Sequence, residues 1–206
     1  MDDELKNQIT EIKYIFNFND RGAVLIDKNN KFYSAGEWFN NGNDDCEDFE
    51  LESRPELDKI NSEDKIVYVG YDVILTKTSL YFFYDNIPRN LPSLETLFDG
   101  KIAKFILPEL KNGEIFIKAH YKDSVVLLTN KKNLYFYSLG SRDYRFYSES
   151  DNVEKYVLTK MKTPETLECI DFEINYYALV YLGYDTKKKD ESSLRKYEFR
   201  SFPYFY

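Results

Sequence analysis

The chain has 206 residues, 43% of them hydrophobic and 17% aromatic, which is enough for one domain or for a tight array of repeats. Its 36 Asp and Glu outnumber its 28 Lys and Arg, and the resulting formal charge of −8 argues against a protein that binds nucleic acid through a basic face. Only 8 Gly and 6 Pro argue against low complexity, and no apolar stretch approaches the roughly 18 residues of a membrane-spanning helix.

Strand periodicity dominates the chain after a polar lead-in at residues 3–12, which fits a short helix or a loop. Apolar runs then alternate with turn signals such as Asp20-Arg21-Gly22 and Lys111-Asn112-Gly113. Residues 94–98 fit a short strand or a helical turn. The other predicted strands are residues 13–18, 23–26, 32–35, 65–71, 73–76, 80–84, 102–107, 115–120, 124–129, 134–139, 153–159, 167–172, 175–182 and 194–199.

A strand–turn–strand unit recurs along the chain, most clearly at residues 126–135. It places Tyr33, Tyr81 and Tyr135 at equivalent positions, 48 and then 54 residues apart, and a looser fourth copy runs from residue 178 to 197. Such a period is typical of propeller blades, and packing neighbouring units together buries both sheet faces. We therefore expect one all-β domain, residues 1–206, of antiparallel meanders in about four degenerate repeats: approximately residues 13–60, 61–110, 111–160 and 161–206.

Three stretches share a pattern of apolar strands around a short polar turn. The clearest is His120-Tyr121-Lys122-Asp123-Ser124-Val125-Val126-Leu127-Leu128-Thr129 with Leu134-Tyr135-Phe136-Tyr137-Ser138-Leu139-Gly140. The second is Ala23-Val24-Leu25-Ile26-Asp27 with Phe32-Tyr33-Ser34-Ala35-Gly36-Glu37-Trp38, and the third is Val69-Gly70-Tyr71-Asp72-Val73-Ile74-Leu75-Thr76. These stretches resemble the RCC1-like repeats (regulator of chromosome condensation). The resemblance implies a β-propeller, here a small or open one because the chain has room for only about four blades, with a sandwich of blade-like meanders as the alternative. The nucleotide-exchange activity of the founding protein is not carried over, because no matching loop is visible.

Sequence motifs for catalysis or metal binding are weak. His120 is the only histidine, and its neighbours Asp123 and Ser124 on one predicted hairpin do not form a catalytic triad. Cys46 and Cys169 have no metal-type spacing, so free thiols in a reducing, cytoplasmic compartment are expected, although a disulfide is possible. We expect no cofactor and no metal, and a carboxylate pair is the one catalytic option left open.

The candidate binding residues are acidic or aromatic. Residues 40–48 form a polar, acidic loop without the ligand order of an EF-hand, and a solvated loop is the plain alternative. The repeated tyrosines are expected either to pack between neighbouring units or to contact a partner. The predicted partner-binding residues are Asp44, Asp45, Glu47, Asp48, Trp38, Tyr33, Tyr81 and Tyr135.

Three functions are compatible with these features. We expect a non-catalytic protein-binding module that docks on a basic surface, in character like phage or mobile-element inhibitors such as anti-CRISPRs. The alternatives are an RCC1-like scaffold or regulatory subunit of a larger assembly, and a hydrolase with a carboxylate pair. No direct nucleic-acid contact and no membrane partner are expected.

Overall fold

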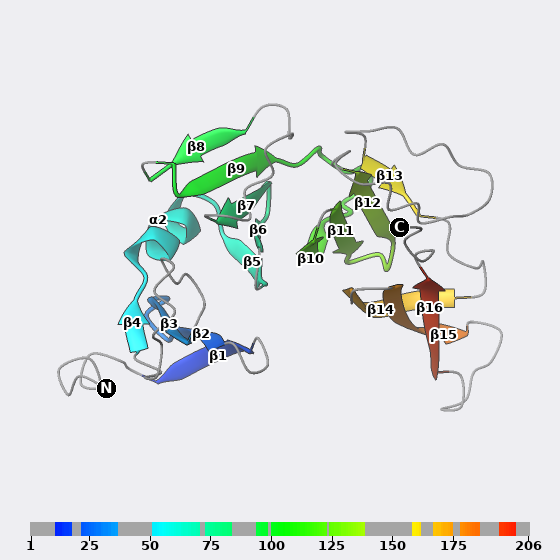
Figure 1. Ribbon diagram of the computed structural model, residues 1–206, viewed down its shortest axis with the longest axis horizontal. Helices are drawn as coiled ribbons and strands as arrows, with labels where there is room; N and C mark the ends of the chain where they lie inside the picture. Colours follow the sequence, from blue (N-terminus) through cyan, green and yellow to red (C-terminus); the bar gives the residue numbers. More distant parts are fainter. Residues whose placement is uncertain are drawn as a thin grey trace, which may run out of the picture. The chain divides into compact units, whose positions relative to one another are not determined.

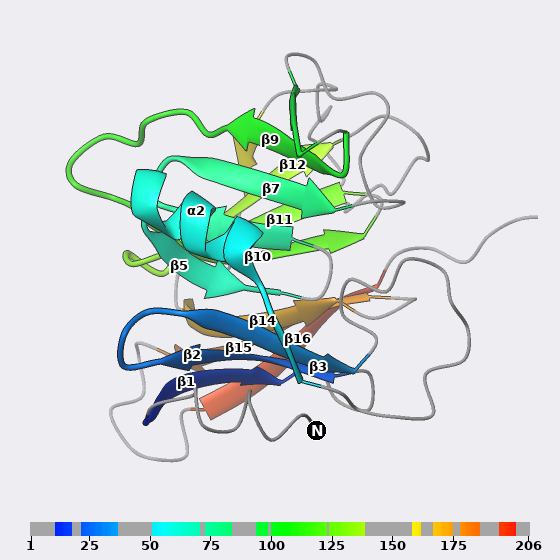
Figure 2. The ribbon, with the colours of Figure 1, turned by 90° about the vertical axis from the view of Figure 1, so that its left-hand side faces the viewer.

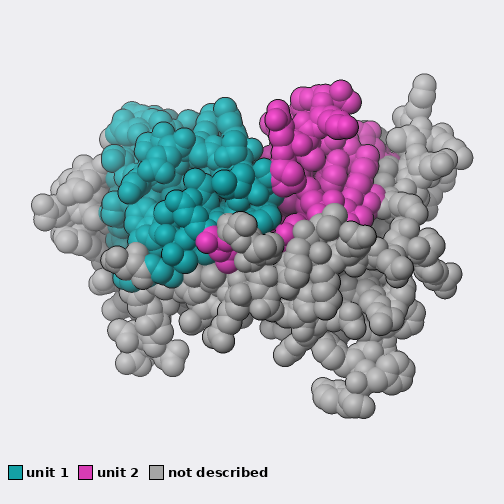
Figure 3. Space-filling view, turned by 90° about the horizontal axis from the view of Figure 1, so that it is seen from above, with its two compact units in different colours: residues 1–87, 95–107 teal, residues 88–94, 108–206 magenta. Residues whose placement is uncertain are grey.

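The computed structural model describes residues 11–17, 22–36, 51–70, 73–83, 94–98, 100–122, 124–138, 158–161, 167–174, 178–185 and 194–200, which form four antiparallel sheets and one short helix (Figure 1). The prediction of an all-β chain of antiparallel meanders is confirmed. The chain divides into two compact units, residues 1–87 with 95–107 and residues 88–94 with 108–206 (Figure 3). The prediction of a single domain stays a prediction.

The first unit contains two sheets. Sheet 1 has the order β1-β2-β3-β4, with β1 (Ile12–Asn17), β2 (Gly22–Asp27), β3 (Phe32–Gly36) and β4 (Leu51–Ser53). Sheet 2 has the order β5-β6-β7-β9-β8, with β5 (Ile66–Val69), β6 (Val73–Thr76), β7 (Ser79–Phe83), β8 (Glu95–Leu97) and β9 (Ile102–Ile106). Residues 94–98 thus contribute a strand rather than a helical turn.

The helix α2 (Pro55–Glu63) connects these two sheets and lies against sheet 2 (Figure 2). Pro55 stands at its start, where a missing N–H costs nothing, and Glu56 and Asp58 in its first turn favour the helix dipole. Leu57 and Ile60, three residues apart, face the core and are buried. The strand predictions assign no element to this segment, because two apolar residues in nine are too few to show a helical period.

The second unit contains sheets 3 and 4. Sheet 3 has the order β10-β11-β12-β13, with β10 (Phe116–Lys122), β11 (Ser124–Thr129), β12 (Leu134–Ser138) and β13 (Leu158–Lys160). Sheet 4 has the order β14-β15-β16, with β14 (Leu167–Ile174), β15 (Ala178–Asp185) and β16 (Leu194–Arg200). The strand predicted to end at Leu182 continues to Asp185, which still pairs with Leu167 of β14.

The same strand register recurs in all four sheets. Each first strand has a register shift just after its beginning, which adds twist at that point. The residues directly before the shift are Ile12, Ile66, Phe116 and Cys169, and they pair with Asp27, Thr76, Thr129 and Gly183. On the second strand, the residue two positions before each of these partners pairs in turn with a tyrosine of the third strand. These tyrosines are Tyr33, Tyr81, Tyr135 and Tyr197. The repeated tyrosines therefore occupy one structural position, and counting from the shift places Tyr197 there as well.

Two buried clusters show how neighbouring sheets pack within each unit. We call the face of sheet 1 that carries Val24, Ile26 and Phe32 the front face, and the face that carries Ile12 and Ile15 the back face; the names apply to equivalent positions in the other sheets. The front face of sheet 1 packs on the back face of sheet 2 together with α2, in a cluster formed by Val24, Ile26, Phe32, Leu57, Ile60, Ile66, Val69, Ile74, Tyr81, Phe83 and Ile102. The front face of sheet 3 packs on the back face of sheet 4, in a cluster formed by Val126, Leu128, Leu134, Phe136, Cys169 and Phe172.

Candidate binding surface

The second strand of sheets 1, 2 and 3 ends in a buried polar residue, respectively Asp27, Thr76 and Thr129. A side-chain oxygen of each accepts a hydrogen bond from the backbone N–H at the start of the next strand, at 2.8 Å from Lys31, 3.0 Å from Ser79 and 3.2 Å from Asn133. These oxygens satisfy turn N–H groups that would otherwise be buried without a partner.

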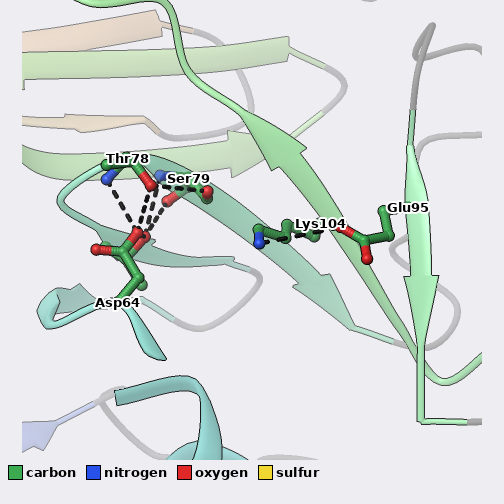
Figure 4. Close-up of polar contacts among 6 residues, drawn as sticks. Asp64, Thr78, Ser79, Glu95 and Lys104 are labelled. Atoms are coloured by element: carbon green, nitrogen blue, oxygen red, sulfur yellow. Dashed lines mark hydrogen bonds and ion pairs between the residues drawn. The ribbon is translucent and has the colours of Figure 1, made fainter. Parts of the chain in front are cut away.

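Asp64 supports the hairpin of sheet 2 from the segment that precedes β5 (Figure 4). Its Oδ2 accepts hydrogen bonds from Thr76 Oγ1 at 2.5 Å, from Thr78 Oγ1 at 2.6 Å and from Thr78 N–H at 3.1 Å. Partial burial alone would raise the pKa of Asp64, but these hydrogen bonds outweigh it and the pKa lies below its ordinary value. Asp64 therefore stays ionised as a brace of the turn.

Glu114 has the equivalent place before β10 in sheet 3. Its Oε1 accepts hydrogen bonds from Thr129 Oγ1 at 2.7 Å and from Asn133 Nδ2 at 2.6 Å, and Tyr135 Oη lies 3.4 Å from its Oε2. Burial raises the pKa of Glu114, but the hydrogen bonds from Asn133, Thr129 and Tyr135 together with the charge of Lys160 outweigh it, so the pKa lies below its ordinary value. The sequence did not reveal these two acids, because each lies outside the strand whose end it stabilises.

In sheet 1 the corresponding support comes from α2. Asp58 Oδ1 accepts the backbone N–H of Phe32 at 2.9 Å, and its Oδ2 pairs with Lys31 Nζ at 3.0 Å. Arg54, beside the helix start, donates from Nε to Ser34 Oγ at 2.5 Å and pairs with Glu52 at 2.8 Å. These described carboxylates are engaged in holding hairpin and helix ends, which is a structural task.

The predicted tyrosines are not equally placed. Tyr33 and Tyr81 are buried, and burial raises the pKa of Tyr81 to about 12. Tyr135 is partly buried, packs edge-on against Phe116 with ring centroids 5.7 Å apart, and lies beside Glu114. Burial of Tyr33 and Tyr81 favours the packing alternative for these two residues. The other predicted binding residues, Trp38, Asp44, Asp45, Glu47 and Asp48, lie outside the described residues.

An exposed apolar surface that the sequence did not indicate lies on β1. Ile12 is 47% exposed, Tyr14 55% and Ile15 60%. The residues equivalent to Ile15 are 1–3% exposed, namely Val69 1%, Ala119 1% and Phe172 3%. The residues equivalent to Ile12 are buried as well, namely Ile66, Phe116 and Cys169. We call Ile12, Tyr14 and Ile15 the β1 surface; Ile12 and Ile15 lie on the back face of sheet 1, and Tyr14, which pairs with Ile26, lies on the front face at the same edge.

Two further findings concern sites of other kinds. Within the described ranges, no group of three or more His, Cys, Asp or Glu side chains is arranged to hold a metal ion. In the same part of the chain, no helix has the length and apolarity needed to cross a membrane.

No family model matches the sequence, and no curated protein matches it. A crystal structure of human WBSCR16 is similar over 80% of this chain, with 12% sequence identity and a TM-score of 0.47. The matched region corresponds to 45% of the WBSCR16 chain.

Proposed function

We propose that this protein is a non-catalytic protein-binding module built from degenerate RCC1-like meanders. The recurring register shift and the equivalent tyrosines support the resemblance to a repeat family, because unrelated hairpins have no reason to share both. The hydrogen bonds of Asp64 and Glu114 support a structural rather than a catalytic use of these acids.

The observation that carries the proposal is the β1 surface. Three large apolar side chains on one strand are about half exposed, and β1 is an edge strand of its sheet. Fully burying an Ile side chain contributes about 1.5–3 kcal/mol, so covering Ile12 and Ile15, which share one face of β1, would add a few kcal/mol to association. Without a partner, an exposed apolar edge strand favours aggregation, and a bound partner would prevent this by covering the strand.

The charge of −8 supports a partner with a basic surface, since opposite charge accelerates association. An inhibitor of the phage or mobile-element type, acting on a nucleic-acid-handling protein, is one form of this proposal. The buried, free thiol of Cys169 is in keeping with a reducing cytoplasmic location.

Affinity capture from the source cell tests the proposal. The tagged wild-type chain, an Ile15→Lys variant and an Ile106→Lys control are compared, followed by mass spectrometry; Ile106 is also an exposed apolar residue but lies on β9. We expect a basic protein to be retained by wild type and control, lost with Ile15→Lys, and released as salt is raised. Capture of the same proteins by all three chains, or of none, would refute the proposal.

A further inference from the structure

The turn that leads into β10 of sheet 3 carries an exposed Asn-Gly pair, Asn112-Gly113. Both residues have a positive φ, +61° and +67°, and the Glu114 N–H donates to the Lys111 carbonyl oxygen at 3.3 Å, which is the arrangement of a type I′ turn. A Cβ built on Gly113 would meet nothing within 4 Å. The turn therefore has room to change its backbone angles without displacing a neighbour.

An asparagine followed by glycine can react with its own backbone, because glycine has no Cβ to hinder the approach of its nitrogen. In this reaction the Gly113 nitrogen bonds to Asn112 Cγ, the bond from Cγ to Nδ2 breaks, and Nδ2 leaves as ammonia with the proton that the Gly113 nitrogen gives up. Water then opens the resulting succinimide ring at one of its two carbonyl groups. The product is aspartate or isoaspartate, and no oxidant or reductant is consumed.

Two observations favour this reaction at Asn112. The Asn112 carboxamide and the Gly113 N–H form no hydrogen bond with another described residue, so both reacting groups are available. In addition, Lys131 Nζ, from the turn between β11 and β12, donates to the Asn112 carbonyl oxygen at 2.6 Å. That oxygen belongs to the same peptide group as the attacking nitrogen, and it shares the negative charge when the nitrogen loses its proton. The ammonium group of Lys131 stabilises this charge and so makes the nitrogen easier to deprotonate.

We propose that Asn112 is a site of spontaneous deamidation, promoted by Lys131 through the Asn112 carbonyl oxygen. Either product adds one negative charge to the formal −8, and isoaspartate also adds one methylene group to the backbone. This methylene enters the chain just before Glu114, whose Oε1 accepts hydrogen bonds from Thr129 at 2.7 Å and from Asn133 at 2.6 Å. The isoaspartate form therefore displaces the acid that supports the hairpin of β11 and β12, as a slow change that the chain makes by itself.

Incubation of the folded full chain at pH 8, followed by peptide mapping, tests the proposal. Trypsin cuts after Lys111 and Lys118, so the peptide of residues 112–118 reports on Asn112 in every variant. Its mass should rise with time by about 1 Da, and a methyltransferase specific for isoaspartate should label the product. Lys131→Met should lower the rate at Asn112 by about threefold to tenfold, since an exposed charge stabilises the developing anion only in part. Lys131→Arg should retain most of the rate.

Two controls separate this contact from general effects of charge. Lys132→Met removes the same charge one residue along and leaves the hydrogen bond from Lys131 in place, so the rate at Asn112 should be retained. Asn41-Gly42, a second Asn-Gly pair in the sequence, lies outside the described residues and serves as an internal reference for the incubation conditions. Circular dichroism checks that the variants remain folded.

The outcomes distinguish the parts of the proposal. An Asn112 that stays intact in the folded chain while it converts in the urea-unfolded chain would overturn the site, because the fold would then protect the pair. Conversion that Lys131→Met leaves unchanged, or that Lys132→Met slows equally, would overturn the role of Lys131. The separated isoaspartate form should unfold at a lower urea concentration than the fresh chain, and an equal midpoint would overturn the effect on Glu114.

Discussion

At the scale of single residues, the hairpins use different chemistry for the same task. Asp27 presents a carboxylate oxygen to the turn directly, while Thr76 and Thr129 present a hydroxyl that in turn donates to Asp64 or Glu114. In sheets 2 and 3, a threonine and the acid that it donates to thus do together what Asp27 does alone in sheet 1. This arrangement keeps the turn N–H groups paired and places the negative charge nearer to solvent, which lowers the cost of burying the charge.

Replacing Asp64 by Asn should destabilise the protein by about 1–2 kcal/mol at pH 7, because the variant loses charge-assisted hydrogen bonds from Thr76 and Thr78. The pKa of Asp64 is lowered in the folded protein, so its contribution is fully present above its ordinary value of 3.8 and is lost as pH falls through the lower, folded value. Urea unfolding of both chains across this range should therefore show the difference in unfolding free energy shrinking toward low pH.

Glu95 provides the matched control for Asp64. It is exposed, and its ion pair with Lys104 spans 3.9 Å, so Glu95→Gln should change the unfolding free energy by less than about 0.5 kcal/mol. An effect of Asp64→Asn that is no larger than this, or that is independent of pH, would contradict the role of Asp64 as an ionised brace.

The Cys169 thiol should be unreactive in the folded chain. Burial raises its pKa to about 11, so only about one thiol in a thousand is ionised at pH 8, and the side chain is enclosed in the cluster of sheets 3 and 4. In a Cys46→Ser background, the rate of reaction with a chromogenic disulfide at pH 8 should be at least about a hundredfold lower than in denaturant. Equal rates in the folded and denatured chain would contradict the packing of β14.

At the scale of the elements, Gly22 at the start of β2 has a backbone that only glycine accommodates. Its φ is +141°, and a Cβ there would collide with the carbonyl oxygen of Ala35 on β3. Gly22→Ala should lower the unfolding free energy by more than about 2 kcal/mol in a urea titration. Gly113→Ala is the control, because Gly113 also has a positive φ of +67° but open space around it; about 1 kcal/mol is expected there. Equal losses would mean that the β2–β3 contact is not tight.

The strands could be predicted from the sequence because the alternation of apolar and polar residues and the turn residues are visible within a few neighbouring positions. The strand 73–76 was placed at its observed bounds, and Tyr33, Tyr81 and Tyr135 were placed at one equivalent position, since both depend on short-range pattern. The features that were missed depend on contacts distant in sequence. Helix α2 is stabilised by the core that receives Leu57 and Ile60, and Asp64 and Glu114 find their partners across a hairpin 12 to 21 residues away.

At the scale of the whole chain, the charge imbalance should make folding stability depend on salt. The excess of 36 acidic over 28 basic residues gives repulsion that is stronger in the compact state than in the expanded unfolded chain. Raising sodium chloride from about 20 mM to about 500 mM shortens the screening length from roughly 20 Å to roughly 4 Å, and the thermal midpoint should rise. The measurement is a thermal melt followed by circular dichroism, at a protein concentration low enough to keep the chain monomeric.

Surface ion pairs such as Lys104–Glu95 are weakened by the same salt, but each contributes at most about 1 kcal/mol. A thermal midpoint that falls as salt is raised would show that such pairs outweigh the net repulsion. The net charge would then no longer be a reason to expect a basic partner.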